Sequence, residues 1–280
     1  MNQVVAVLGR GVVSAETPIL RANDLGALRG EGVFETMHVR GGGVWLLDAH
    51  LTRMEASASR IALDLPPRAE LVELVETACA QWPAEQEGAL RLVSTRGDEA
   101  GGPGTTFVTL TPVAEAVRRV RRTGVRVVTA SLGLHATARP TMPWLLGGVK
   151  STSYAVNLAS LRWAAREGAD DVLWVSSDGY ALEAPTASLV WLVDDTLWTV
   201  PPAQTGILAG TTARWLLDHA GELGYRSGER LVRPAELMSA EGVWLTSSVR
   251  GVVPVRELDG AALPLHPRTT ALRELMGFPS

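Results

Sequence analysis

The 280-residue sequence contains little lysine, little cysteine and no long apolar run. Its single cysteine, Cys79, excludes an intramolecular disulfide and any metal site made of several cysteines, and we expect it on the buried face of a helix. The longest uncharged stretch, 196–213, contains two prolines, a glutamine and several threonines, so we predict no membrane span. The first residues alternate like a strand and lack the features of a secretory signal, which makes the cytoplasm the expected location.

Several catalytic motifs are also missing from the sequence. The histidines at positions 38, 50, 135, 219 and 266 form neither HExxH nor another paired metal spacing, so we predict no metal site. The absence of GxSxG, of a P-loop and of GxGxxG removes the usual anchors for a serine hydrolase, an NTPase or a Rossmann enzyme. The formal net charge of −4 comes from 26 basic and 30 acidic residues that are interspersed, so we predict no nucleic-acid partner.

Lys150 is the only lysine, beside 25 arginines. A primary amine can lose its proton and condense with an aldehyde, whereas a guanidinium stays protonated. Lys150 is therefore either a chance surface residue or a reactive amine, and its surroundings have to decide between the two.

The length of the chain favours two domains, and the arginine-rich segment 112–122 is the candidate connection between an α+β domain over residues 1–115 and a larger domain over residues 116–280. Asp48 is the expected N-cap of one helix, and a second helix is expected from about residue 68 to 81. Further along the chain we predict a helix over 151–167, two hairpins that turn at 178–179 and 194–195, and a helix from Thr211 to about Leu223.

Three features of the second half suggest one chemistry. Lys150 follows a Gly-Gly turn, Glu183 lies 33 positions later in a predicted strand, and a Gly-Thr-Thr sequence begins the helix at Thr211. The threonines could be ordinary helix caps, but a helix N-terminus also favours a phosphate. An amine, a carboxylate and a phosphate cradle match the needs of pyridoxal 5'-phosphate, which has an aldehyde, a pyridine nitrogen and a phosphate.

Five segments in order carry a family resemblance: GEGVFET from residue 30, HLTR from 50, GGVKSTSY from 147, LEAPTASLVW from 182 and ILAGTTARWLL from 207. They resemble the class IV aminotransferases, which are fold-type IV pyridoxal-phosphate enzymes. This resemblance implies a two-domain fold of the α+β or α/β type, like that of D-amino acid aminotransferase. A small N-terminal α/β domain and a larger C-terminal pseudo-barrel domain would share a pyridoxal 5'-phosphate cleft, and the enzyme would be a homodimer.

The resemblance also implies roles for individual residues. Lys150 would form the Schiff base with the cofactor and carry protons, and Glu183 would pair with the pyridine nitrogen. Tyr154 lies near the position of a tyrosine that contacts the phenolic oxygen in some members, although packing in the core explains it equally well. The expected phosphate ligands are Arg53, Thr211, Thr212 and Ser248.

Within the family, WLTSSVRGVVPV resembles the aminodeoxychorismate lyases, and STRG resembles a strand shared by these lyases and the D-amino acid aminotransferases. The D-amino acid aminotransferases, however, have a histidine where Asp98 stands here. We therefore expect a 4-amino-4-deoxychorismate lyase that makes 4-aminobenzoate and pyruvate for folate synthesis. The alternatives are a transaminase for branched-chain amino acids, D-amino acids or amines, and a member that binds without catalysis. The substrate would be a small anionic amine, with Thr36 as a catalytic residue and Phe34, His38, Arg96 and Arg250 as substrate-binding residues.

Overall fold

The computed structural model describes residues 3–278, which divide into two compact units. The first unit contains the residues up to Ala114 together with Val149–Tyr154, and the second contains Glu115–Gly148 and the residues from Ala155 onward. The sequence placed a single boundary after residue 115. It did not predict that the short segment around Lys150 belongs to the first unit.

The first unit is built on a six-stranded antiparallel sheet with the order β2-β1-β6-β5-β3-β4. Its strands are β1 (Val4–Val7), β2 (Gly11–Val13), β3 (Gly32–Arg40), β4 (Gly43–Val44), β5 (Gly88–Thr95) and β6 (Thr106–Pro112). Its helices are α1 (Leu25–Leu28), α2 (Leu47–Arg60) and α3 (Arg68–Cys79).

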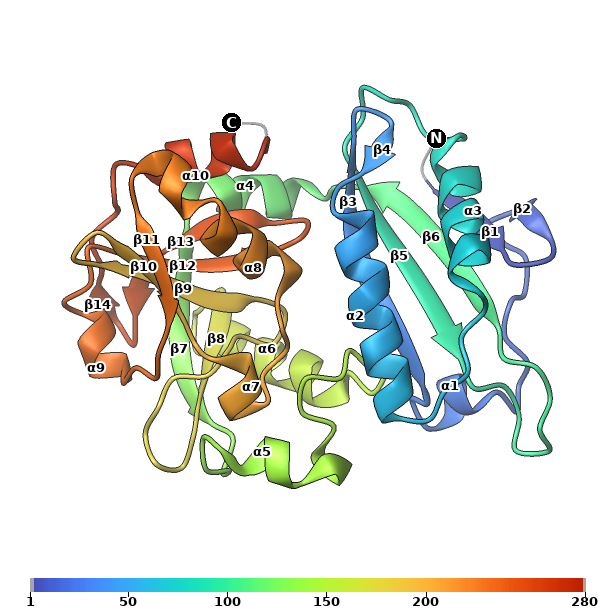
Figure 1. Cartoon of the computed structure of the whole chain (residues 1–280), viewed down its shortest axis with the longest axis horizontal. Helices are drawn as coiled ribbons and strands as arrows, with labels where there is room; N and C mark the ends of the chain where they lie inside the picture. The colour runs from blue at the N-terminus through green and yellow to red at the C-terminus, as the bar shows by residue number, and fades with distance from the viewer. Residues whose placement is uncertain (1–2, 279–280) are drawn as a thin grey trace. The chain divides into compact units, whose positions relative to one another are not determined.

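Helices α2 and α3 pack on one face of this sheet (Figure 1). Alternate residues of β3, β5 and β6 point toward the helices and form a core with the apolar stripe of α2. Cys79 is buried on α3, as predicted. The N-cap of α2 is Leu46, so the prediction of Asp48 as the N-cap was wrong. Asp48 lies instead in the first turn of α2, where its negative charge interacts favourably with the helix dipole.

The second unit is built on a sheet with the order β11-β10-β9-β12-β13-β7-β8, with β14 paired to β13. Its strands are β7 (Val125–Ser131), β8 (Asp171–Val175), β9 (Ser188–Val193), β10 (Thr196–Thr199), β11 (Arg226–Glu229), β12 (Gly242–Ser247), β13 (Gly251–Leu258) and β14 (Ala261–Ala262). Its helices are α4 (Glu115–Thr123), α5 (Ala138–Thr141), η1 (Pro143–Leu145), α6 (Ala155–Arg166), α7 (Pro202–Thr205), α8 (Thr211–Asp218), η2 (Ala220–Leu223), α9 (Pro234–Leu237) and α10 (Thr269–Leu275).

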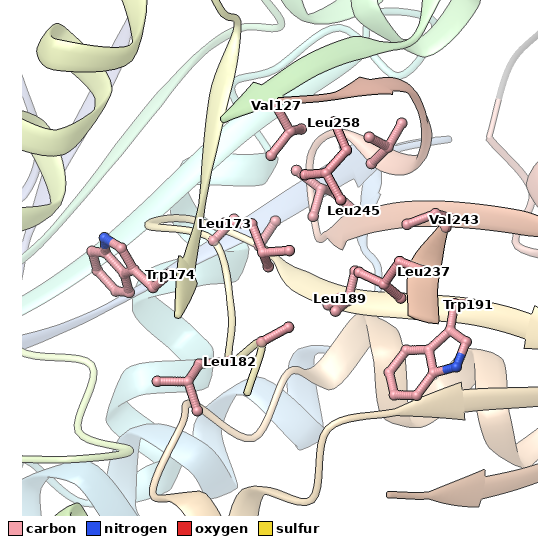
Figure 2. Close-up of a cluster of buried hydrophobic side chains, with 14 of the residues drawn as sticks. Val127, Leu173, Trp174, Leu182, Leu189, Trp191, Leu237, Val243, Leu245 and Leu258 are labelled. Atoms are coloured by element: carbon pink, nitrogen blue, oxygen red, sulfur yellow. The ribbon is translucent and has the colours of Figure 1, made fainter. Parts of the chain in front are cut away.

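The core of the second unit is a cluster of aliphatic and tryptophan side chains from its central strands (Figure 2). Each fully buried large side chain contributes about 1.5–3 kcal/mol through the hydrophobic effect. The predicted hairpin that turns at 194–195 is present as β9 and β10, whereas the one that turns at 178–179 has no second strand among the described residues and is reduced to an isolated antiparallel bridge between Val175 and Ala181. The turn between β9 and β10 uses Asp194 and Asp195 with positive φ, the geometry of a two-residue hairpin loop.

The helix predicted over 151–167 begins later than expected, because α6 starts at Ala155. Residues 150–152 instead lie along the edge of β3, where the N–H of Phe34 donates to the carbonyl of Lys150 at 3.0 Å and the N–H of Thr152 donates to that of Gly32 at 2.9 Å. Strand β3 thus provides hydrogen-bond partners for backbone groups that would otherwise bond within a helix. Gly32 permits this close approach, since a Cβ there would lie 2.8 Å from the carbonyl oxygen of Ser94 and 3.0 Å from Oγ1 of Thr152.

Within residues 3–278, every helix is too short or too polar to cross a lipid bilayer.

Candidate functional site

The amine of Lys150 lies against two aromatic rings of the first unit. The antiparallel bridge between Val33 and Ser151 places Lys150 beside Phe34. As a result, Nζ is 4.7 Å from the centre of the Phe34 ring and 5.9 Å from that of Tyr154. The two rings meet edge to face, with centroids 5.2 Å apart. Both distances lie within the range of cation–π contacts. These contacts bring together three predicted site residues, while the contact of Tyr154 with a cofactor oxygen stays a prediction.

The sheet face that carries Phe34 also carries Thr36 of β3 and a basic residue of β5, Arg91, which was not predicted from the sequence. Thr36 is half-buried and pairs directly with Arg91 of β5. The guanidinium of Arg91 is exposed and lies 5.8 Å from the centre of the Phe34 ring. The alternation of β5 could have revealed it, because Arg91 stands between the buried Leu90 and Leu92 and must therefore point to the opposite face of the sheet. A guanidinium near the Lys150 amine is suited to binding a carboxylate.

Two other predicted substrate residues of this unit are held by partners within it. The side chain of His38 is fully buried, with Nε2 2.8 Å from a carboxylate oxygen of Glu87. Arg96 pairs with Glu31 through Nε and donates to the carbonyls of Ala62 and Ile61 at 2.8 and 2.6 Å. Their substrate contacts stay predictions, and either residue would have to leave these partners to make one.

Arg53, the predicted phosphate ligand of this unit, projects from α2 toward β3. Its Nε donates to Oε1 of Glu35 at 2.7 Å, and its Nη2 donates to Oε2 at 2.5 Å. One turn further along α2, Oγ of Ser57 accepts the backbone N–H of Lys150 at 3.1 Å. Helix α2 therefore contacts Lys150 through Ser57 and Glu35 through Arg53. No role for Glu35 or Ser57 was predicted from the sequence.

In the second unit, Glu183 lies in a segment that pairs with β8. Its Oε1 accepts from Nη1 of Arg139 at 3.2 Å, and its Oε2 accepts from the backbone N–H of Leu208 at 3.1 Å. Both donors stabilise negative charge on the carboxylate. Since Leu208 lies three residues before Thr211, the second contact ties Glu183 to the loop that leads into α8.

The start of α8 has the properties of an anion site. Its N-cap is Gly210, which supplies no side-chain cap, and Thr211 and Thr212 open the helix as buried residues. Oγ1 of Thr212 is buried and has no hydrogen-bond partner among the described residues. A buried hydroxyl without a partner costs free energy, so its position at a helix N-terminus fits a phosphate group that accepts its hydrogen bond.

Ser248 and Arg250 follow β12, which pairs with β9 of the same sheet. Ser248 is buried. Nη1 of Arg250 donates to the fully buried carboxylate of Asp171 at 2.7 Å, and Nη2 donates to Oγ1 of Thr186 at 3.0 Å. Arg250 thus links the segment that contains Glu183 to the one that contains Ser248. These hydrogen bonds do not support the predicted contact of Arg250 with the substrate.

The sheets of the two units and the lysine segment on β3 define an enzyme of the fold-type IV class. Residues 32–258 match the family described as Amino-transferase class IV, and the chain belongs to this family. The bifunctional aminodeoxychorismate lyase / D-amino acid transaminase of Mycobacterium tuberculosis is 41% identical over 281 residues, which cover 98% of this chain and 97% of that protein.

Two solved structures extend the comparison. A hypothetical aminotransferase from Mycobacterium tuberculosis in a PLP-bound form has a TM-score of 0.94 at 42% identity, covering 99% of this chain and 98% of that one. The fold IV-transaminase CpuTA1 from Curtobacterium pusillum has a TM-score of 0.93 at 37% identity, covering 99% and 97%. The predicted fold class is therefore confirmed.

Proposed function

We propose that this enzyme uses pyridoxal 5'-phosphate to act as a 4-amino-4-deoxychorismate lyase. The observation that carries the proposal is the placement of the Lys150 amine over Phe34, on the same sheet face as Thr36 and Arg91. This face offers a base, a hydroxyl and a cation to a small anionic amine. The first activity in the name of the Mycobacterium tuberculosis relative is the same reaction.

Each cofactor group has a candidate partner in this chain. Lys150 would bind the aldehyde carbon, Glu183 the pyridine nitrogen, and Thr211, Thr212, Ser248 and Arg53 the phosphate. When bound, the cofactor supplies an electron sink that stabilises negative charge on the carbon bearing the substrate's amino group. The orphaned hydroxyl of Thr212 and the doubly bound carboxylate of Glu183 support this assignment.

The chain's own residues would move the protons and hold the substrate. The Lys150 amine would take the proton from the ring carbon that bears the amino group and would supply a proton to the enolpyruvate group as the ring carbon–oxygen bond breaks, so that pyruvate leaves and 4-aminobenzoate remains. Thr36 would donate a hydrogen bond on the same face, and Arg91 would bind a substrate carboxylate. The proposal includes a cytoplasmic location and a place in folate precursor synthesis, since 4-aminobenzoate is the product.

The second candidate is a transaminase for D-amino acids. It is favoured by the second activity in the name of the same relative and by the transaminase structures that the fold matches. A single carboxylate beside the reacting amine, held by Arg91, would serve this reaction as well. Asp98 argues against this candidate, because D-amino acid aminotransferases have a histidine at the corresponding position.

A direct comparison of activities tests the choice. The purified enzyme is supplied with aminodeoxychorismate in one reaction, and with D-alanine and 2-oxoglutarate in another. We expect 4-aminobenzoate to form with the higher kcat/KM. Rapid amino transfer without any aromatic product would establish the transaminase instead, and no turnover in either assay would support the binding-only alternative.

We also propose that the enzyme is a homodimer, as the family resemblance implies. Helix α6 supports this, because it exposes Val156 and Leu158 at 64% and 46% of their surface. A partner that covered these side chains would remove their apolar surface from water, which is favourable. Sedimentation velocity should give twice the mass of one chain, and Leu158→Glu should shift the protein toward monomer. A wild-type monomer would refute the proposal.

A further inference from the structure

A carboxylate lies in an otherwise apolar row of β3. Val33, Met37 and Val39 alternate along the strand under α2, and each is fully buried. Glu35 occupies the same row and is also fully buried. A charge removed from water in this way is costly unless the surrounding groups compensate for it.

Two residues of α2 provide this compensation. Arg53 donates to both carboxylate oxygens of Glu35, and Nδ1 of His50 lies 2.6 Å from Oε2. The two residues are three positions apart, so they share a helix face. Burial alone would raise the pKa of Glu35, but the charge of Arg53 and the hydrogen bonds from Arg53 and His50 outweigh it and lower the pKa to about 2. Glu35 therefore stays an anion, and because a carboxylate only accepts, the proton between it and His50 belongs to Nδ1.

This arrangement determines how Arg53 is oriented. Glu35 accepts hydrogen bonds from Nε and Nη2 of Arg53, which form one edge of the planar guanidinium. This two-point contact fixes both the direction and the plane of the guanidinium. Nη1 is not part of this edge. Arginine otherwise samples many rotamers, and a fixed fork loses less entropy when it binds an anion.

Stability alone is a poor explanation for this network. Well-packed apolar residues usually stabilise a core as well as a buried ion pair does, or better. The neighbouring positions on β3 are apolar and pack without difficulty, so a carboxylate at position 35 serves stability no better than a leucine would.

We propose that Glu35 is a positioning residue that holds the Arg53 guanidinium in the orientation that binds the cofactor's phosphate, with His50 completing the support. This inference rests on the proposed function, which assigns Arg53 to that phosphate. Glu35 touches neither cofactor nor substrate in this scheme and acts only through Arg53.

The test compares two ligands that differ only in the phosphate. Binding of pyridoxal 5'-phosphate and of pyridoxal to the apoenzyme is measured by absorbance titration for wild type, Glu35→Gln, Arg53→Met and the double variant. We expect Glu35→Gln to weaken pyridoxal 5'-phosphate about 10- to 100-fold and pyridoxal less than about 3-fold, since only the former uses Arg53. In the Arg53→Met background, Glu35→Gln should change neither affinity.

Two further variants control for folding. Glu55→Gln is the matched control, because Glu55 lies on the same helix and pairs with Arg68 at 2.8 Å, and it should leave both affinities unchanged. Glu35→Asp keeps the charge but shortens the side chain, and it should give an intermediate loss that is again specific to the phosphate ligand. Circular dichroism and thermal melts confirm that each variant is folded before titration.

The remaining outcomes separate this inference from the proposed function. If Glu35→Gln weakens both ligands equally, or if its effect adds fully to that of Arg53→Met, Glu35 is only structural and the inference is wrong. If Arg53→Met itself leaves the preference for the phosphorylated ligand intact, the assignment of Arg53 to the phosphate fails, and the inference fails with it. Lys150 would keep its proposed role in either case.

Discussion

The amine of Lys150 lies 4.7 Å from the centre of the Phe34 ring because residues 150–152 extend along the edge of β3. Phe34 and Lys150 are neighbours across this short pairing, so their side chains emerge on the same face. The position of the Lys150 amine is therefore determined by a strand contact between segments more than a hundred residues apart in the sequence.

Removal of the Lys150 amine should abolish turnover. Lys150→Ala should lower kcat by at least about 10³-fold, since a positioned acid-base group contributes about 10²- to 10⁴-fold. Lys150→Arg should be equally inactive, because a guanidinium keeps its proton. Both variants should fold normally, as judged by circular dichroism, and activity retained by Lys150→Arg would show that the lysine is not the reactive group.

Loss of the Arg91 cation should weaken substrate binding. Arg91→Leu should raise KM for the carboxylate substrate about 10- to 100-fold, because a hydrogen bond to a charged group contributes about 1.5–3 kcal/mol. Steady-state kinetics measure this, with Arg60→Leu as the control, since Arg60 is an exposed arginine at the end of α2. An unchanged KM in Arg91→Leu would remove Arg91 from the site.

Thr212→Val should separate cofactor binding from stability. The buried hydroxyl has no partner among the described residues, so the apoenzyme should keep its melting temperature, while affinity for pyridoxal 5'-phosphate should fall about 10-fold. Thr199→Val is the contrast, because its hydroxyl donates to the carbonyl of Leu189 at 2.7 Å. That variant should lose stability and keep its affinity, and the opposite pattern would argue against a phosphate at Thr212.

The close approach of β3 to the lysine segment should make Gly32 sensitive to substitution. Gly32→Ala should destabilise the protein by about 1–3 kcal/mol and lower kcat, since the new methyl group displaces either Ser94 or the segment that carries Lys150. Gly43→Ala is the matched control, because nothing lies within 4 Å of a Cβ at that position. Denaturant unfolding and kcat are measured for both, and equal behaviour of the two variants would contradict the prediction.

The buried charge of Glu35 should make the free energy of unfolding depend on pH in the acid range. Its pKa is lowered from 4.5 to about 2 on folding, so its contribution is fully present above pH 4.5 and is lost as the pH falls toward 2. This contribution is on the order of 3 kcal/mol. Urea unfolding of wild type should show a decline over that range, and the decline should be shallower in Glu35→Gln. Parallel curves would show that Glu35 does not titrate differently in the folded protein.

Local patterns were sufficient to predict several elements. The turn residues 194–195 predicted the hairpin between β9 and β10, and the apolar spacing predicted α2, although its N-cap was wrong. The helix predicted to start at Ser151 was wrong in its first four residues, because partners on β3 take the backbone hydrogen bonds that would have continued the helix. Local periodicity contains no information about such distant partners.

The sequence by itself determined the family, through five segments in order, and it singled out Lys150 and Glu183 by their chemistry. Only the tertiary structure decided which groups surround them. It placed Arg91 opposite Thr36, bound Arg96 and Arg250 within their own units, and set Glu35 against Arg53. The reason is that hydrogen bonds and ion pairs depend on distance in space, and strand register and helix packing bring together residues that are far apart along the chain.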